Sequence, residues 1–121
     1  VEVIVRQKGL EIGNGKQVLA RFPLLKEEDL GEDRLDDEGN LDVTRLYDLK
    51  RLSDYLVKIK EKYPDKTDAV VLMEPDIEYR ALIRVMDSVR ATFVRQQGED
   101  GTPDVLQQVV LFPDISIGDA P

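Results

Sequence analysis

The sequence predicts an α+β fold, in which a single mixed β-sheet of about four to five strands carries two α-helices on one face. A short, apolar, β-branched run at 69–73 is typical of a strand buried on both of its faces. Two longer segments, 44–63 and 79–93, repeat apolar residues at steps of three and four, which is typical of amphipathic helices. The expected element order is β-β-α-β-α-β within one domain, residues 1–121.

The first strands are predicted from alternation. Valines at every second position of 1–5 give that segment one apolar face, and the strand pattern resumes at 10–12. The dipeptide Asn14-Gly15 is a strong signal for a tight turn. A return strand is therefore expected over Gln17–Phe22.

Segment 24–43 is predicted to be a solvated acidic loop, with a helical turn around Lys26–Leu30 left open. Nine acidic residues lie between Glu27 and Asp42, against a single arginine, whereas the rest of the chain is neutral. The first long helix is expected to follow over about 44–63. Asp42 or Thr44 is a candidate to accept hydrogen bonds from the first free amides of that helix.

The apolar strand at 69–73 is followed by a turn and a second helix. Pro75 cannot donate to a sheet and keeps the preceding residue extended, which ends the strand. Asp76 is then expected to cap the helix by accepting hydrogen bonds from its first amides. The apolar stripe of this helix is expected to comprise Tyr79, Leu82, Ile83, Met86, Val89 and Phe93.

The C-terminal part is predicted to contain one more strand. Gln96–Asp104 contains two glycines and a proline and is expected to be a loop. Val105–Phe112 is then the last strand of the sheet. The tail 113–121 is expected to be extended, and mobile unless it docks on something.

Composition excludes several kinds of site. The chain has no cysteine and no histidine, which excludes disulfides, zinc sites of the Cys/His type and Ser-His-Asp triads. The net charge is −8, and the acidic loop would repel a phosphate backbone, so nucleic acid is not an expected partner. No apolar run approaches the roughly 20 residues of a membrane-spanning helix. Because the chain opens on Val1 and not on methionine, we expect a fragment of a longer protein.

Two motifs near the N-terminus have both a functional and a structural interpretation. Gly13–Lys16 suggests a phosphate-binding loop, but it lacks the required spacing, and a hairpin turn is favoured. Asp36–Asp42 suggests a calcium loop, but Arg34 would stand at the first ligand position of an EF-hand. A solvated acidic loop is therefore favoured, with weak cation binding left open.

The turn before the second helix groups Glu74, Asp76 and Glu78 beside Tyr79. Paired carboxylates can perform acid–base chemistry, but helix capping is the favoured interpretation. The basic residues that follow are expected to form a solvated face, or to meet an acidic partner or the chain's own acidic loop. These are Arg80, Arg84, Arg90 and Arg95.

Two separated stretches resemble the periplasmic domain of the ExbD/TolR family of biopolymer transport proteins. One is the apolar strand followed by EPDIEY and LIRVMDSVR, and the other is the ending LFPDISIGDAP. The resemblance is good from about Lys50 onward and covers Val1–Phe22 only in outline. The segment between them looks longer than the usual link of the family.

The resemblance implies a non-enzymatic protein-interaction domain of a proton-motive-force-coupled complex for energy transduction and biopolymer transport. Such a protein is a single-pass inner-membrane protein with this domain in the periplasm, and its transmembrane helix would precede Val1. The implied partners are an ExbB/TolQ-like membrane channel protein, a TonB/TolA-like periplasmic protein and a second copy in a homodimer.

No catalytic residue, cofactor or metal is expected. The candidates for a structural or interaction role are Pro75, Asp76, Tyr79, Leu82, Met86 and Asp87. The alternative is a cytoplasmic α+β ligand-binding or regulatory domain, which a membrane helix encoded upstream would exclude. An enzyme that uses Asp76, Glu78 and Tyr79 is a third interpretation.

Overall fold

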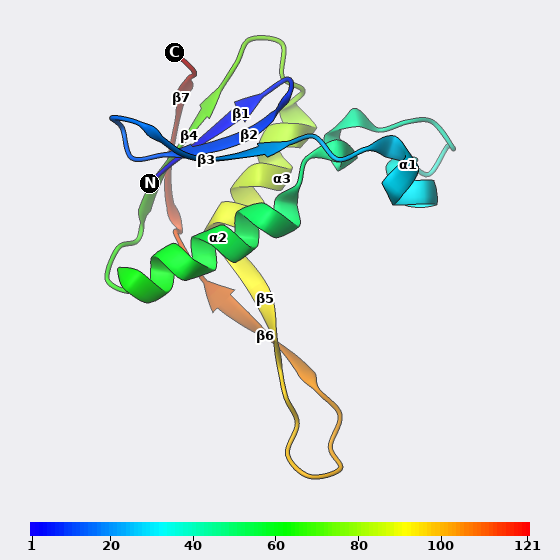
Figure 1. Cartoon of the computed structure of the whole chain (residues 1–121), viewed down its shortest axis with the longest axis vertical. Coiled ribbons are helices and arrows are strands. Elements are labelled where there is room, and N and C mark those ends of the chain that lie inside the picture. The colour runs from blue at the N-terminus through cyan, green and yellow to red at the C-terminus, as the bar shows by residue number, and fades with distance from the viewer.

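The computed structural model describes all residues 1–121 and confirms an α+β fold with a mixed five-stranded sheet. The strands are β1 (Glu2–Arg6), β2 (Gly9–Gly13), β3 (Val18–Pro23), β4 (Asp68–Met73) and β7 (Asp114–Asp119). They lie in the order β3-β2-β1-β4-β7 (Figure 1). The pairs β1–β2 and β2–β3 are antiparallel, whereas β4 lies parallel to both β1 and β7.

The two long helices cover one face of this sheet. The helices of the chain are α1 (Glu27–Leu30), α2 (Leu49–Lys62) and α3 (Tyr79–Arg90), with the 3₁₀ helices η1 (Gly31–Arg34) and η2 (Val43–Leu46). The two long helices, α2 and α3, were expected, and they pack against each other beside the sheet (Figure 1). The third helix, α1, is a short turn with no buried residue, and it lies away from the sheet.

The core lies between the sheet and the two long helices. β1 contributes Val3 and Val5 to it, whereas the buried Ile4 between them is outside the core cluster. In β4, Val70 and Leu72 are only half-buried, so the prediction that this strand is buried on both faces is wrong. The reason is that both long helices lie on the same face. The other central side chains of the core are Leu10, Ile12, Leu52, Leu56, Val71, Val85, Leu111 and Phe112.

The N-terminal strands lie where the sequence pattern placed them, but the turn at 7–8 between β1 and β2 was not predicted. The segment predicted as one interrupted strand forms the antiparallel pair β1–β2, and β3 is the expected return strand. The Asn14 side chain accepts hydrogen bonds from the amides of Lys16 and Gln17, both at 2.9 Å. These bonds close the turn between β2 and β3, which confirms the hairpin interpretation of the glycine-rich motif.

The first long helix begins later than predicted. Residues 43–46 form η2, and α2 begins only at Leu49. The Asp42 carboxylate accepts from the amide of Thr44 and therefore caps η2. The cap of α2 is Asp48, which accepts from the amide of Arg51 at 3.2 Å. The apolar periodicity hid this break, because a 3₁₀ turn shifts the spacing by less than one residue per turn.

The second helix ends earlier than predicted, at Arg90. Phe93 is therefore not part of the helical stripe; it lies in β5 (Ala91–Gln96), where its side chain is 63% exposed. β5 pairs only with β6 (Val105–Val110), so the segment predicted as the last strand of the main sheet forms a separate hairpin. This hairpin projects from the body of the molecule (Figure 1).

The C-terminal tail is a strand of the main sheet. Residues 114–119 form β7, which pairs with the whole length of β4 from Asp68↔Asp114 to Met73↔Asp119. Ile115 packs against the core from this strand. The prediction that the tail is mobile unless it docks is thereby resolved, because the tail docks along β4 within the chain.

Candidate functional site

The turn between β4 and α3, residues 74–78, is anchored to the turn between β1 and β2. The Glu74 carboxylate accepts from the amide of Gln7 at 2.6 Å and from the Arg6 guanidinium at 3.2 Å. The Gln7 side chain donates in turn to the carbonyl of Pro75 at 3.4 Å. These bonds fix the segment that contains two of the six candidate residues, Pro75 and Asp76.

A chain of ion pairs continues from this anchor across the sheet. Glu11 bridges Arg6 at 2.6 Å and Arg21 at 2.8 Å through its two carboxylate oxygens. The hydrogen bond from Arg6 is the main reason that the pKa of Glu11 lies below its usual value, and Arg21 acts in the same direction. The carboxylates of Glu11 and Glu74 thus accept hydrogen bonds from arginines and a backbone amide that join neighbouring segments. This favours a structural role over acid–base chemistry at this end of the sheet.

Asp76 does not cap α3. The residue at the cap position is Glu78, and no side chain bonds to the first free amides of the helix. Asp76 instead has a backbone φ of +67°, the only positive φ among the residues other than glycine. Aspartate tolerates this left-handed conformation better than most residues, so the turn chemistry explains its presence where the sequence suggested a cap.

The other candidates lie along α3 and do not form a single site. Tyr79 is 71% exposed at the start of the helix, so its place in the core stripe is wrong. Leu82 is buried in the core as predicted, and Met86 is half-buried against it. Asp87 lies on the exposed side and pairs with Arg90 at 3.3 Å.

The structure identifies a buried acid that the sequence placed in a solvated acidic loop and considered as a helix cap. The side chain of Asp42 is 1% exposed, and it accepts from the Thr44 hydroxyl at 2.6 Å. It also faces Arg45 and Arg80, both at 3.3 Å, and Arg84 at 3.8 Å. Burial opposes the ionised form, but the Thr44 hydrogen bonds and the arginines outweigh it and hold the pKa of Asp42 below its usual value.

This cluster shows what the first two arginines of the predicted basic face contact. Arg80 and Arg84 meet Asp42 at the end of the chain's own acidic segment, one of the expected outcomes. Arg90 pairs within the helix, and Arg95 lies outside it, in β5. Nothing in the sequence near Asp42 indicates its burial, because its partners lie on a helix far along the chain.

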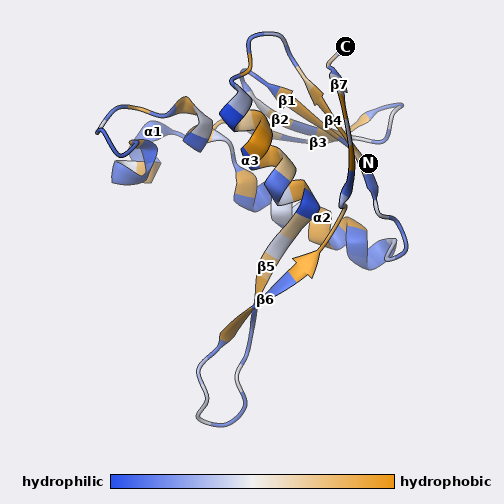
Figure 2. Cartoon of the chain, turned by 180° about the vertical axis from the view of Figure 1, so that it is seen from behind, coloured by the Kyte–Doolittle hydropathy of each residue, from blue (hydrophilic) through white to orange (hydrophobic).

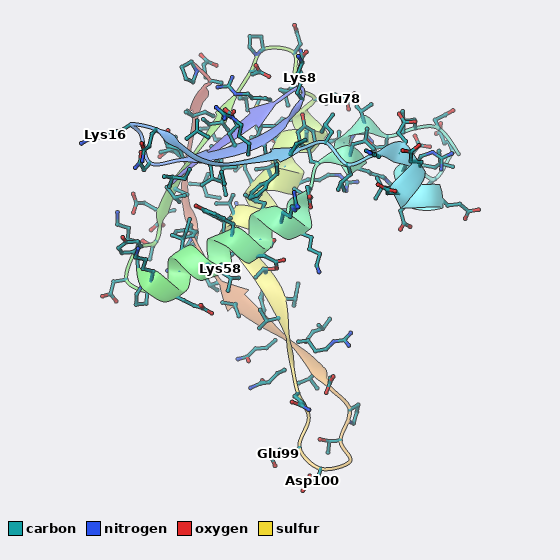
Figure 3. All side chains as sticks on the ribbon, viewed as in Figure 1. Lys8, Lys16, Lys58, Glu78, Glu99 and Asp100 are labelled. Carbon is teal, nitrogen blue, oxygen red and sulfur yellow. The ribbon has the colours of Figure 1, made fainter.

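A small pocket opens beside this cluster, with a volume of about 270 Å³. It lies where the β1–β2 turn, η2 and the start of α3 meet, at the end of the molecule where Figure 3 labels Lys8 and Glu78. Tyr47 lines it and donates its hydroxyl to the carbonyl of Arg6 at 2.7 Å. Burial raises the pKa of Tyr47, so this hydroxyl stays a neutral donor at pH 7. The remaining lining residues are Gln7, Leu24, Val43, Thr44, Leu46, Asp76, Ile77, Glu78 and Ala81.

Two further properties bear on function. No group of three or more His, Cys, Asp or Glu side chains comes together in a way that could hold a metal ion. The helices are too short or too polar for any of them to cross a lipid bilayer. Comparison of the chain with protein-family models, curated proteins and solved structures gives no match.

Proposed function

We propose that this chain is a non-enzymatic protein-interaction domain of a proton-motive-force-coupled inner-membrane complex for energy transduction and biopolymer transport. In this proposal the domain lies in the periplasm as a homodimer. Its partners are an ExbB/TolQ-like channel protein in the membrane and a TonB/TolA-like periplasmic protein. The proposal rests on the resemblance to ExbD/TolR proteins, together with one feature of the fold.

That feature is the meeting of the two stretches that carry the resemblance. β4 leads directly into the first stretch, and β7 belongs to the second. The two strands are paired in parallel, and the amide of Ala120 donates to the carbonyl of Met73 at 2.7 Å. Two stretches that resembled a family only by chance would not be expected to pair with each other in the fold, so the pairing of β4 with β7 supports the proposal.

An interaction role also fits the open edges of the sheet. β7 ends the sheet on one side and β3 ends it on the other. An extended segment of a partner can add to such an edge, where main-chain hydrogen bonds supply affinity and side-chain pockets supply specificity. On β7, Ile117 is 55% exposed and offers an apolar contact to an added strand.

The pocket beside Tyr47 favours the alternative, a cytoplasmic ligand-binding or regulatory domain. Most of its lining is apolar, with Asp76 and Glu78 as the charged groups. Its volume of about 270 Å³ is small beside the roughly 300–1,000 Å³ of typical ligand sites. The pocket therefore supports the alternative less than the paired strands support the interaction domain.

Protease accessibility of the full-length gene product separates the two proposals. The protein would be produced in a bacterium with two membranes and treated with protease before and after the outer membrane is permeabilised. We expect the domain to be digested once the outer membrane is open, while a cytoplasmic control protein stays intact. Digestion only after lysis of the inner membrane would overturn the periplasmic proposal and favour the cytoplasmic alternative.

A further inference from the structure

The hairpin of β5 and β6 forms a two-stranded sheet that is separate from the main sheet. We call residues 91–110 the arm; it consists of the two strands and the tip at 97–104. Neither strand pairs with any other strand of the chain. A two-stranded hairpin alone is at best marginally stable in water, whereas three or more strands with an apolar face are stable. A partner that adds strands to the arm would therefore stabilise it.

Only one face of the arm is covered by the chain itself. Val94 and Val109 line a hollow together with Val57 and Lys60 of α2, and Val109 packs against the core. The opposite face carries Phe93, Leu106 and Val110, whose exposed fractions are 63%, 66% and 58%. Phe93 lies opposite Gln108, and residues that lie opposite each other in an antiparallel pair point to the same face. Alternate residues of a strand also share a face, so Leu106 and Val110 lie on the face of Gln108 and Phe93. Figure 2 shows the apolar residues continuing from the body onto the arm.

The sequence of β6 suits pairing with its own copy. Val105–Val110 contains no charged residue, so two copies can lie side by side without like charges in contact. In a symmetric antiparallel pair, the two-fold axis is perpendicular to the sheet, so a given residue points to the same face in both copies. Residues that lie opposite each other must also share a face, whereas consecutive residues of a strand point to opposite faces. The axis must therefore lie between the two copies of a single residue, which then faces itself.

Two residues near the middle of the strand can occupy the axis, and they give different contacts. With Gln108 on the axis, Leu106 lies opposite Val110, and the apolar side chains of the exposed face meet. With Gln107 on the axis, Leu106 lies opposite Gln108, Asp104 lies opposite Val110, and the apolar pair Val105–Val109 forms on the other face. Because only the register centred on Gln108 pairs the apolar side chains of the exposed face, that register is favoured.

This register also brings opposite charges together. Continued beyond the ends of β6, it directs the tip of one arm toward the base of the other, where Lys60 Nζ lies 5.3 Å from the centroid of the Phe112 ring. The tip of the arm has Glu99, Asp100 and Asp104 and no basic residue, whereas segment 57–66 at the end of α2 has four lysines and two acids. Figure 3 shows Glu99 and Asp100 at the tip and Lys58 on α2 beside the base of the arm.

We propose that two copies of this chain dimerise through their arms, β6 against β6 in antiparallel orientation about Gln108. The result is a four-stranded sheet, β5-β6-β6-β5, in which the acidic tip of each arm reaches the lysine-rich end of α2 in the other copy. The contact is reciprocal, as a closed two-fold dimer requires. The inference rests on the homodimer of the proposed function, but it concerns the purified chain alone and is tested independently of location.

Sedimentation velocity over a concentration series tests the arm as the dimer contact. We expect a reversible dimer whose dissociation constant rises at least about tenfold in Leu106→Lys, because a lysine then lies opposite Val110 in both of the symmetric apolar pairs. The matched control is Ile117→Lys on β7, which has a similarly exposed apolar side chain and is expected to change the constant by less than about twofold. A strict monomer at all concentrations, or a dimer weakened by Ile117→Lys and not by Leu106→Lys, would overturn the proposal.

Cross-linking and a charge exchange test the register. Because the chain has no cysteine, Gln108→Cys creates a single thiol, which is expected to form a disulfide-linked dimer on oxidation. Leu106→Cys, whose partner is Val110, is expected to form none. Asp104→Lys and Lys60→Glu should each weaken the dimer, and the double variant should restore it. Equal cross-linking at both positions, or failure of the double variant to recover affinity, would contradict the register.

Discussion

Two aspartates decide how the segments around α3 are held, and they do so in different ways. Asp76 contributes a backbone conformation, since its φ is +67° and its side chain does not cap the helix. Asp42 contributes its charge, since it is buried among Thr44 and arginines from η2 and α3. The two roles predict different responses to substitution.

At Asp76 we expect alanine to destabilise the fold and glycine to be tolerated. Alanine in the left-handed region costs about 1–2 kcal/mol, whereas glycine adopts that region without a steric cost. The free energy of unfolding in urea should therefore fall by about 1 kcal/mol in Asp76→Ala and change by less than about 0.5 kcal/mol in Asp76→Gly. Equal losses in the two variants would indicate a side-chain role, such as the cap that the sequence suggested.

At Asp42 we expect a stability contribution that depends on pH. The pKa of Asp42 is lowered in the folded state, so its contribution is present above the unfolded pKa of about 3.9. It is lost as the pH falls through the lower, folded pKa. Asp42→Asn should therefore lower the free energy of unfolding at pH 7 by about 1–3 kcal/mol, and the difference from the unmodified chain should shrink below about pH 4.

Denaturant unfolding between pH 7 and pH 2.5 measures this difference. The matched control is Asp37→Asn in the same acidic segment, where the side chain is exposed and the expected change is within about 0.5 kcal/mol. If Asp37→Asn and Asp42→Asn had the same effect at every pH, general charge repulsion would explain the acidic segment better than the buried cluster does.

Among the elements, α3 connects the sheet to the arm, and its residues differ sharply in burial. Leu82→Ala should cost about 2–4 kcal/mol, because it leaves a cavity in the core. Met86→Ala should cost less, since Met86 is half-buried, and Tyr79→Ala should change stability by less than about 0.5 kcal/mol. Chemical denaturation of the three variants checks the order. A large loss from Tyr79→Ala would contradict the exposed position of its ring.

β7 is expected to protect β4, because it covers the edge that β4 would otherwise expose. Truncation after Phe112 should speed amide hydrogen exchange throughout Asp68–Met73, since the hydrogen bonds to β7 and the contact of Ile115 with the core are lost. Ile115→Ser in the full chain is the milder control. Unchanged exchange in β4 after truncation would show that β7 is dispensable.

The elements also show what sequence can and cannot provide. Periodicity predicted both long helices and the segments of β1 to β3, but it missed the turn that separates β1 from β2. A continuous apolar run predicted β4. Periodicity failed at Phe93, because one apolar residue after Val89 fits a helix and a strand equally well. It failed at β7, because a short terminal strand is specified by pairing with β4 and not by its own pattern.

The candidate site was predictable in part, for the same reason. The sequence predicted a turn at 74–78, where local signals are strong, and the turn is present, but Asp76 does not cap the helix. It could not assign Asp42 to a buried cluster, because the partners Arg80 and Arg84 come from another part of the chain. Burial of a charge depends on tertiary contacts, which a single sequence does not display.

At the scale of the whole molecule, our proposals assign two separate surfaces to other chains. One is the edge of the main sheet at β7, and the other is the arm, which extends from the body at the opposite side of α2 (Figure 1). In the proposed assembly, the arm joins two copies and the β7 edge remains free for a periplasmic partner. A dimer built through the arms would thus present two sheet edges at once, which increases avidity for a partner with two binding segments.

Site-specific photo-crosslinking in living cells tests the central claim most directly. A photoreactive residue would replace Ile117 on β7 in the full-length protein, and a matched one would replace Leu41 in the acidic segment. We expect cross-links from position 117 to a TonB/TolA-like periplasmic protein, with a yield that changes when a protonophore collapses the proton motive force, and none from position 41. Cross-links to cytoplasmic proteins, or a yield that is the same with and without the protonophore, would contradict a role in proton-driven energy transduction.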